Sequence, residues 1–428
     1  MKHSFHKYLW AAALTFMTGN SLYAQHVYTL EECIEEALHN NVQIKNADNN
    51  LSAARHDKGK AFTNYFPTVG ATGGGFLSDK GLAEMELAPG QSMMLLKNGV
   101  VGGVSATLPL FTGGQIVNGN RLAEVNVEVN QLQRRQSENE VRLTTEQYFW
   151  QVVMLKEKLK TLAVVDEQLK AIHKDVENSV TAGLTNRNDL LQVKLRMNET
   201  RSNNLTVENA LSVSRSLLAQ YIGHPADSID VSLPLDGQLP ERPEKLYRTP
   251  DASLLLTNEY HLLKKNVDAN RLQYKMTLGK NLPTIAIGGG YMYEYLMDKD
   301  HAFWMGFATI NIPLSGWWGG SHDIKKQKLA LKNAENTLYD QSELLKIRML
   351  NTWNGLNEAY KQMEIAMESI EQATENLRLQ TDYYQAGTCT MSDLLEAQTL
   401  YQQSRDKYVE SYAQYEVKKR EYLQATGR

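Results

Sequence analysis

Cysteine is scarce in this chain, with only two among 428 residues. Cys33 and Cys389 lie far apart and match neither a zinc-ligand spacing nor a redox spacing. The sequence therefore argues against a disulfide framework and against a cysteine-based metal site. The roles of the two thiols stay open at this level.

Long apolar runs are also missing. Beyond the N-terminus no stretch offers 18 consecutive apolar residues, so no transmembrane helix is expected. At the N-terminus, Lys2 and Lys7 precede a short apolar stretch, which predicts a secretory signal peptide over residues 1–24. The alternative is an N-terminal anchor helix, but the run is too short to span a bilayer. An exported chain of this kind is either a soluble secreted protein or a membrane β-barrel.

Positive charge is not in excess either. The 45 basic and 49 acidic residues give a net charge of −4, and removal of Lys2 and Lys7 leaves 43 against 49, or −6. This balance does not favour a nucleic-acid partner. The ten histidines are scattered, and there is no phosphate-binding loop or catalytic constellation. We therefore expect neither an enzyme, nor a cofactor or metal site, nor an energy source within this chain.

The chain contains an internal duplication. Four pairs of landmarks recur at a constant offset of 204 residues: Pro109 and Pro313, Gly183 and Gly387, Asp189 and Asp393, Gly223 and Gly427. A duplicated unit of this length indicates an architectural element repeated to build a wall or tube. The sequence thus predicts repeat one over 25–223, a proline-rich connector over 224–250 and repeat two over 251–428.

Each repeat has the pattern helix, two glycine-rich strands, a very long helix, a glycine turn and another long helix. The first helices are predicted over 29–65, with Thr29 and Glu32 as a capping box, and over 251–282. The very long helix 115–182 would measure about 100 Å at 1.5 Å per residue. Because proline interrupts helices and strand ladders, four prolines are interpreted as strand-to-helix hinges: Pro67, Pro109, Pro283 and Pro313.

The strand segments alternate apolar and small or polar residues. We predict strands over 68–77, 100–108, 284–296 and 302–312, with an outer loop over 78–98. Strands of about ten residues suit an outer-membrane barrel, whereas a soluble sandwich would not explain so few strands between such long helices. The aromatic side chains Tyr291, Tyr293, Tyr295 and Trp304 are interpreted as a membrane belt, the alternative being ordinary strand packing.

Four strands cannot close a barrel. Two chains would supply eight strands, a barrel filled by side chains, and three chains would supply twelve, enough for an open lumen. Exposed sheet edges are also a liability that assembly removes. The sequence therefore predicts an oligomer, and a trimer if the tube conducts.

The long helices carry heptads, which predict coiled-coil packing. In repeat two the row Leu356, Met363 and Ile370 is large, and a parallel row of Ala359, Ala366 and Ala373 is small. By the 204-residue offset, that alanine row corresponds to the large row Leu155, Leu162 and Leu169 of repeat one. Large residues facing small ones would let neighbouring helices interdigitate.

The signal, the duplicated unit and the glycine-turn motif together resemble the TolC-type outer-membrane efflux proteins. The motif comprises 384–388 and 392–398 in repeat two and 182–185 and 188–192 in repeat one. The resemblance implies a mixed α and β fold: a trimeric 12-stranded barrel in the outer membrane of a Gram-negative bacterium, continued by a long periplasmic α-helical coiled-coil barrel.

The same resemblance implies contact with outer-membrane lipid and two protein partners, a periplasmic adaptor and an inner-membrane pump of the RND or ABC type. It implies an exit duct for a tripartite efflux pump or a type I secretion system. The alternative function is a periplasmic coiled-coil scaffold that conducts nothing. The substrate cannot be read from the sequence.

Site residues follow from the same resemblance. A periplasmic constriction is expected at Asp393 and Glu396, with Asp189 and Gln192 as their repeat-one counterparts; the adaptor-docking tips are expected at Gly183, Leu184, Thr185, Gly387, Thr388 and Cys389. Some family members carry a basic residue where this chain has Cys389. The simpler interpretations are first-turn acids for the aspartates and left-handed helix caps for the glycines. Because only repeat two keeps both acids, it is predicted to hold the gate.

Overall fold

The structure is a computed structural model, and it describes residues 26–81, 83–89, 91–95, 97–225, 229–231, 233, 239–296, 299–314 and 316–428. The predicted signal peptide, 1–24, lies outside the described residues. The chain forms two compact units. Unit 1 comprises Met1–Asn46, Gln136–Thr257 and Leu345–Arg428, and unit 2 comprises Ala47–Arg135 and Asn258–Leu344. Each unit therefore contains part of both predicted repeats.

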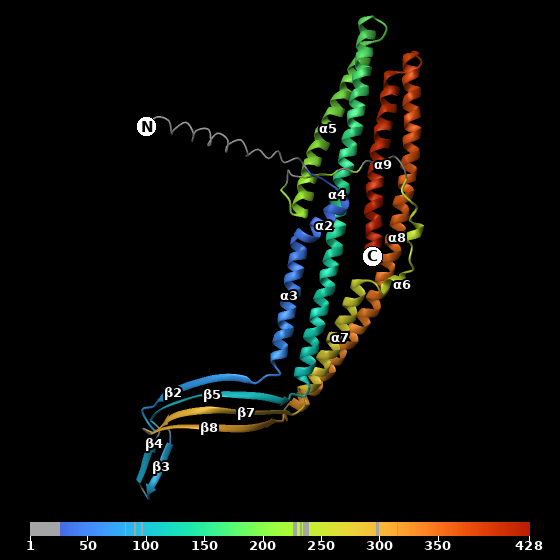
Figure 1. Ribbon diagram of the computed structural model, residues 1–428. Helices are drawn as coiled ribbons and strands as arrows, with labels where there is room; N and C mark the ends of the chain where they lie inside the picture. The colour runs from blue at the N-terminus through green and yellow to red at the C-terminus, as the bar shows by residue number, and fades with distance from the viewer. Residues whose placement is uncertain are drawn as a thin grey trace, which may run out of the picture. The chain divides into compact units, whose positions relative to one another are not determined.

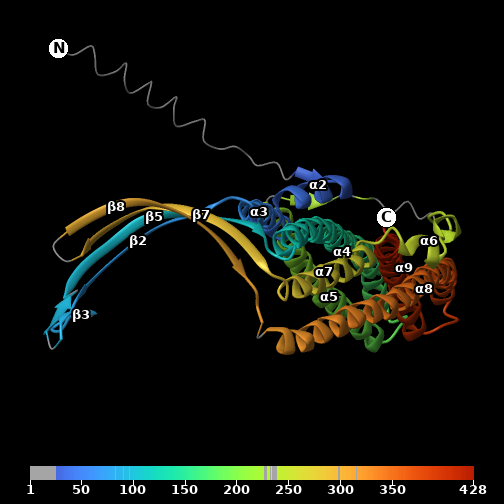
Figure 2. The same cartoon turned by 90° about the horizontal axis from the view of Figure 1, so that it is seen from below.

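Unit 2 contains the four predicted strands in one antiparallel sheet. Its order is β2 (Thr68–Leu77), β5 (Asn98–Phe111), β7 (Thr284–Leu296) and β8 (Lys299–Asn311). Figures 1 and 2 show these strands side by side in a curved ribbon. Within the described residues, β2 and β8 each have one strand neighbour, so both edges of the sheet are unpaired. The two strands of repeat one thus pair with the two strands of repeat two through β5 and β7.

The two faces of this sheet differ in chemistry. The register aligns Val104, Tyr291 and Trp304 on one face, where the other strands add further aliphatic side chains. The opposite face is mixed: it carries the polar residues Thr72, Ser105, Thr107, Thr284 and Thr309, but also the apolar side chains Phe303, Met305 and Phe307 of β8. Because successive residues of a strand point to opposite faces, the sheet has one mainly apolar face and one face of mixed polarity. That division is the pattern of a membrane strand with a lipid side and a lumen side.

Three of the four prolines lie at strand ends, as predicted. Pro67 and Pro283 directly precede β2 and β7, and Pro313 follows the last residue of β8 by two positions. Pro109 differs, because β5 continues through it to Phe111 and the pairing shifts between these two residues. The expected end of that strand at Pro109 is therefore wrong.

The turn out of β5 is made by glycine. Gly113 and Gly114 have φ values of 62° and 77°, a backbone region that glycine enters without a steric penalty. A Cβ on Gly113 would lie 2.2 Å from the carbonyl oxygen of Gly279, so the two backbones are in contact. The strand-to-helix bend of repeat one thus depends on two glycines next to the proline and not on the proline itself.

The aromatic residues of the expected belt lie along the strands. Tyr291 pairs directly with Trp304, and their ring centroids are 5.2 Å apart. Tyr293 and Tyr295 follow on the same face of β7, opposite Ala302 and Asp300. Residues two apart on a strand differ by about 6.6 to 6.8 Å in height. Within one chain the three tyrosines therefore form a column rather than a row at one depth.

Two small strand pairs were not expected. The predicted loop 78–98 contains a hairpin of β3 (Ala83–Ala88) and β4 (Gln91–Leu95). In unit 1, β1 (His26–Tyr28) pairs in parallel with β6 (Ile229–Val231), which lies in the predicted connector. Strands of three residues carry too few alternating positions to be recognised in a sequence.

The helix that begins each repeat is broken in two. The predicted helix 29–65 is α2 (Leu30–Asn40) followed by α3 (Val42–Thr63), and the predicted helix 251–282 is α6 (Pro250–Leu254) followed by α7 (Asn258–Gly279). The capping box of Thr29 and Glu32 is confirmed. At the first break Asn41 is extended, and its side chain accepts a hydrogen bond from the Gln43 amide, 2.8 Å away. Since α3 and α7 both have 22 residues, the break is part of the repeated unit.

The long helices agree with the predicted pattern. They are α4 (Gln115–Thr181), α5 (Arg187–Ile222), α8 (Gly316–Gln385) and α9 (Met391–Ala425). The remaining described helix is a short 3₁₀ turn, η1 (Pro243–Leu246), in the connector. None of the described helices is both long and apolar enough to cross a membrane.

In unit 1 the heptad rows form the core. Leu356 and Met363 of α8 are fully buried in one cluster with Tyr408 and Tyr415 of α9. The large row of α4, with Leu155, Leu162 and Leu169, and the alanine row of α8 are both buried as well. The predicted coiled-coil faces are therefore the packed faces of these helices.

Candidate functional site at the hairpin tips

In unit 1, α4 and α5 form one hairpin, and α8 and α9 form another (Figure 1). Gly183 and Gly387 end α4 and α8 with φ values of 72° and 71°. The Leu184 amide donates to the Ser179 carbonyl and the Thr388 amide to the Tyr383 carbonyl, at 2.8 and 2.9 Å. These are Schellman caps, in which a left-handed glycine satisfies the last helical carbonyls. The predicted left-handed caps are confirmed, and the tips are equivalent in backbone.

The second helix of each hairpin starts with a polar cap. Asn186 accepts from the Asp189 amide and Thr390 from the Asp393 amide, both at 3.2 Å. Thr390 also donates back, since its amide and hydroxyl lie 2.8 and 2.7 Å from Asp393 Oδ2. Hydrogen bonds from the Thr390 side chain and backbone lower the pKa of Asp393. Asp393 is therefore ionised and held at the start of its helix by a full capping box.

Asp189, the repeat-one residue that corresponds to Asp393, makes a different contact. The Thr185 hydroxyl donates to Asp189 Oδ2 at 2.5 Å. Tyr384 of the other hairpin lies beside this pair, and its pKa is raised by burial first and by the charge of Asp189 second, while a hydrogen bond with Thr185 opposes the shift. The hydroxyl of Tyr384, at the end of α8, thus lies close to the Thr185–Asp189 pair at the start of α5.

The remaining two expected constriction residues differ in environment. Glu396 is exposed and lies one turn beyond Asp393 on α9, so the two carboxylates share a helix face. Gln192 is partly covered, and its side-chain oxygen is buried without a hydrogen-bond partner among the described residues. The described residues contain no cluster of three or more His, Cys, Asp and Glu that could hold a metal ion.

The tips share a small apolar core. Leu394 and Met391 of α9 are almost fully buried with Val176 of α4 and Val193 of α5. Leu190 and Leu395 also pack against this cluster, whereas Leu191 is 49% exposed. Leu184, at the end of the first tip, is 82% exposed. The tip therefore presents leucine outward at two positions while its interior stays packed.

Both cysteines are free thiols. Cys389, at the second tip, is half-buried, and its sulfur contacts the Gln380 carbonyl at 3.5 Å. Burial raises the pKa of Cys389 and raises that of the fully buried Cys33 to about 12. Because the thiolate is the reactive form, both thiols are held in their less reactive state.

Above the tips, the contact between the two hairpins combines apolar packing, such as Trp150 of α4 against Tyr412 of α9, with a row of polar pairs. Side chains of α9 reach those of α4 and α5 at four levels: Gln398 to Gln168 at 3.1 Å, Gln402 to Arg196 at 3.0 Å, Glu410 to Lys158 at 2.6 Å, and Arg420 to Glu146 at 3.8 Å. We call this row the hairpin seam. Sequence reasoning missed it, although Gln398 belongs to the repeated motif, because a polar residue inside a heptad does not reveal its partner.

Several polar atoms of the hairpin seam are buried without a hydrogen-bond partner among the described residues, including Gln398 Oε1 and Arg196 Nε. Burial is also the largest cause of the raised pKa of Glu146, which reaches about 7 although Arg420 opposes the shift. An unsatisfied buried polar atom costs on the order of 1–3 kcal/mol. The polar pairs of the hairpin seam therefore contribute less stability than the apolar residues, such as Trp150 and Tyr412, that also join the two hairpins.

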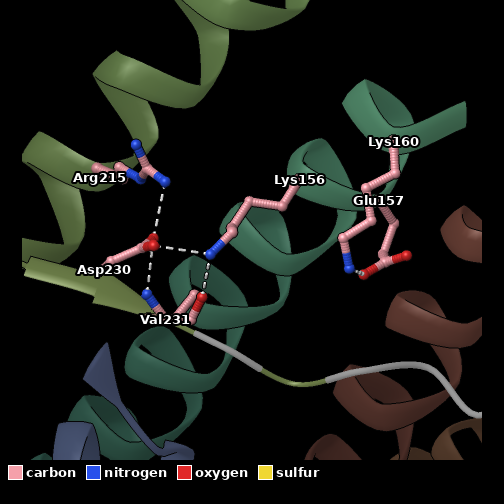
Figure 3. Close-up of polar contacts among 6 residues, drawn as sticks. All are labelled: Lys156, Glu157, Lys160, Arg215, Asp230 and Val231. Carbon is pink, nitrogen blue, oxygen red and sulfur yellow. Dashed lines mark hydrogen bonds and ion pairs between the residues drawn. The ribbon is translucent and has the colours of Figure 1, made fainter. Parts of the chain in front are cut away.

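A second polar cluster fixes the connector strand, as Figure 3 shows. Asp230 of β6 accepts from Lys156 of α4 at 2.8 Å and from Arg215 of α5 at 2.7 Å. Lys156 also donates to the Val231 carbonyl at 2.6 Å. Burial alone would raise the pKa of Asp230, but Lys156 and Arg215 outweigh it and the pKa is lowered. This ionic cluster ties the first hairpin to the connector.

Comparison with known proteins agrees with this architecture. Residues 33–224 match the family described as "Outer membrane efflux protein". Comparison with curated protein sequences gave no match.

Solved structures match along almost the whole chain. The outer-membrane channel OprN has 15% identity and a TM-score of 0.79, over 93% of this chain and 89% of its own. VceC from Vibrio cholerae has 14% identity and a TM-score of 0.76, over 93% and 96%. The open state of the MtrE outer membrane channel of Neisseria gonorrhoeae has 16% identity and a TM-score of 0.76, over 93% and 88%. The fold is therefore that of outer-membrane channels.

Proposed function

We propose that this chain, which belongs to the outer membrane efflux protein family, assembles in the outer membrane as a trimeric exit duct for a tripartite efflux pump or a type I secretion system. The observation that carries the proposal is the open, two-faced sheet of four strands. Unpaired strand edges cannot persist in lipid, because no water satisfies their backbone groups. Three copies would pair all edges in a barrel of twelve strands, wide enough for a lumen.

The helical hairpins would supply the periplasmic part of the duct, with the tips as its entrance. Exposed Leu184, with Thr185 and Gly183 beside it, suits contact with an adaptor protein at the first tip. Gly387, Thr388 and Cys389 form the equivalent turn of the second tip. An inner-membrane pump would supply energy, because the chain has no phosphate-binding loop.

The second hairpin, α8–α9, is the proposed gate. Its contact with the first hairpin includes the hairpin seam, which has buried unsatisfied polar atoms, and the approach of Tyr384 to Asp189, beside apolar contacts such as Trp150 with Tyr412. The polar contacts cost less to break than the apolar ones, since their polar atoms regain water. Asp393 and Glu396, three-fold repeated around an axis, would form acidic rings that favour cations.

Purified, assembled protein in a planar lipid bilayer tests the duct. We expect single-channel conductance with a preference for K⁺ over Cl⁻, and Glu396→Gln should lower that preference. Asp393→Asn is the better partner variant than alanine, because its side chain can still accept the Thr390 hydrogen bonds. Assembled protein that never conducts would favour the non-conducting scaffold.

A further inference from the structure

A hollow lies within unit 2, between the end of α3 and the beginning of α4 (labelled in Figure 1). Its volume is about 470 Å³. The residues that matter for its chemistry are Arg55, Lys58, Gly59 and Phe62 of α3, Tyr65 just beyond α3, and Arg121 of α4. We call it the basic hollow.

The basic hollow exists because a helix side chain is missing. Gly59 lies inside α3, and a Cβ built on it would meet nothing within 4 Å. Glycine in a helix interior costs up to about 1 kcal/mol relative to alanine, so its presence there leaves space at the expense of stability. Asn120 donates to the carbonyls of Ala61 and Ile116, both at 2.9 Å, and thereby fixes α3 against α4. Asn120 therefore holds together the two helices that line the basic hollow, while the space next to Gly59 stays unfilled.

The charge of the basic hollow is positive, although the chain as a whole is acidic. Lys58 is paired with Glu124 at 2.8 Å. Arg55 and Arg121 have no ion-pair partner among the described residues, and both are exposed at the rim. Arginine presents several N–H donors in a fork that matches the oxygens of a phosphate. Two unpaired guanidinium groups beside a hollow therefore favour a phosphate-bearing anion.

Aromatic rings lie next to the basic residues, at the end of α3 that leads into β2. Phe62 makes edge contacts with Tyr65 and Phe66, with ring centroids 5.7 and 5.4 Å apart. All three rings are about half-exposed, and the chain enters β2 at Thr68, two residues after Phe66. Exposed aromatic rings at the end of a membrane strand lie at the depth of the lipid headgroups.

We propose that the basic hollow binds the headgroup of an anionic phospholipid in the periplasmic leaflet of the outer membrane. The phosphate oxygens accept from Arg55 and Arg121, and the glycerol and upper acyl chain lie against Phe62 and Tyr65. This inference depends on one part of the proposed function, namely that the sheet lies in the membrane. It adds a lipid site that fixes the depth and orientation of the barrel at the start of β2.

Repeat two supplies a natural control. At an offset of 216, that of Pro67 and Pro283, Arg55 corresponds to Arg271, which forms ion pairs with Asp268 and Glu335. Gly59 corresponds to Lys275, so no hollow is left by a missing side chain. The aromatic residues Phe62, Tyr65 and Phe66 correspond to Leu278, Asn281 and Leu282. The same place in repeat two therefore lacks the free arginine, the glycine and the rings.

Native mass spectrometry of the full assembled protein, stripped of lipid in detergent, tests the proposal. Phosphatidylglycerol and phosphatidylcholine are titrated separately, and inorganic phosphate is added as a competitor. We expect tighter binding of phosphatidylglycerol, with an affinity reduced about 30-fold in Arg55→Gln/Arg121→Gln, since each basic residue at a membrane surface contributes about 1 kcal/mol. Gly59→Leu, which fills the hollow, should also weaken this binding. Lys325 is the repeat-two counterpart of Arg121 at the 204-residue offset. The affinity of the matched control Arg271→Gln/Lys325→Gln for phosphatidylglycerol should stay within about twofold of that of the wild type.

Three results would overturn the proposal. The first is equal affinity for both lipids in the wild type, or no loss in the double variant. The second is complete displacement by submillimolar phosphate, which identifies a site for free anions. The third is dissociation of the lipid-free assembly in Arg55→Gln/Arg121→Gln, which shows that a second copy of the chain covers the hollow. Selective lipid binding by a protein that does not conduct would contradict the proposed duct and leave the lipid site standing.

Discussion

The two hairpins of this protein share a backbone and differ in side chains. Schellman caps with left-handed glycines recur at 183 and 387, and again at 223 and 427, each pair separated by 204 residues. At the tips, however, Asp393 completes a capping box on its own helix, whereas Asp189 is engaged by Thr185 and faces Tyr384 of the other hairpin. Duplication has preserved the positions where the chain must turn, and the side chains between them have acquired separate tasks.

The same contrast holds at the other end of each repeat. Both first helices are interrupted, at Asn41 and at 255–257, and resume for 22 residues, but the glycine, the free arginines and the exposed rings of the basic hollow belong to repeat one. The backbone landmarks that both repeats share therefore identify the architecture. The residues that differ between the two repeats are the candidates for functional roles.

The largest expected effect concerns the row of large leucine side chains in α4 and the row of small alanine side chains in α8. Leu162→Ala should lower the free energy of unfolding by about 2–5 kcal/mol, and Ala366→Leu by about 1–3 kcal/mol through overpacking. If the leucine row of α4 faces the alanine row of α8, the double variant should lose less than the sum of the two. Thermal or denaturant unfolding in detergent measures this double-mutant cycle. Strict additivity would mean that the two rows do not touch.

Glu146 gives the second prediction, because its counterpart in repeat two is the apolar Leu350. Burial raises the pKa of Glu146 to about 7, and Arg420, Glu416, Lys419 and Arg142 are the charged groups around it. Its folded pKa lies above its unfolded value, so the stability it contributes is complete below about pH 4.5 and is lost as the pH rises through 7. Relative to Glu146→Gln, the wild type should therefore lose up to about 3 kcal/mol between pH 4.5 and 8.

A flat pH profile for the stability difference between wild type and Glu146→Gln would show that Glu146 is already ionised in the folded protein at pH 5.

Asp230 should show the opposite pH dependence. Its folded pKa is lowered, so its stabilising contribution is present above the unfolded pKa near 3.9 and is lost as the pH falls through the folded value. At pH 7, Asp230→Asn should lower the free energy of unfolding by about 1–3 kcal/mol, because Lys156 and Arg215 lose a charged acceptor. The gap between wild type and variant should shrink as the pH falls below 3.8. No gap at pH 7, or a gap that does not shrink on acidification, would contradict a stabilising charge on Asp230.

The smallest expected effect separates the two tips. Thr390→Ala and Asn186→Ala should each cost about 1 kcal/mol of local stability, and the loss at Thr390 should be the larger because its cap is reciprocal. Hydrogen exchange of the first-turn amides of α5 and α9 reports each loss locally. Equal losses would mean that the capping box adds nothing beyond a single cap.

Local signals explain what the sequence could predict. The capping box at Thr29, the strand over 68–77 and the glycine caps depend on residues within a few positions of one another, and all three are confirmed. The break at Asn41 was missed because asparagine carries no helix-breaking signal comparable to proline; only its side-chain bond to Gln43 shows why the chain bends there. The hairpin seam was missed for a different reason. Gln398 and Gln168 are 230 residues apart, and no local pattern pairs them.

We expect the second hairpin to act as a gate whose contact with the first hairpin includes Tyr384. Single-channel conductance of the assembled protein tests this expectation, with Tyr384→Phe compared against Tyr383→Phe. The neighbouring Tyr383 is 47% exposed and serves as the matched control. Tyr384→Phe removes a hydroxyl close to Asp189 but keeps the ring in the tip core. We predict a higher resting conductance in Tyr384→Phe and wild-type conductance in Tyr383→Phe. Equal conductance in the wild type and both variants would contradict a gate at Tyr384.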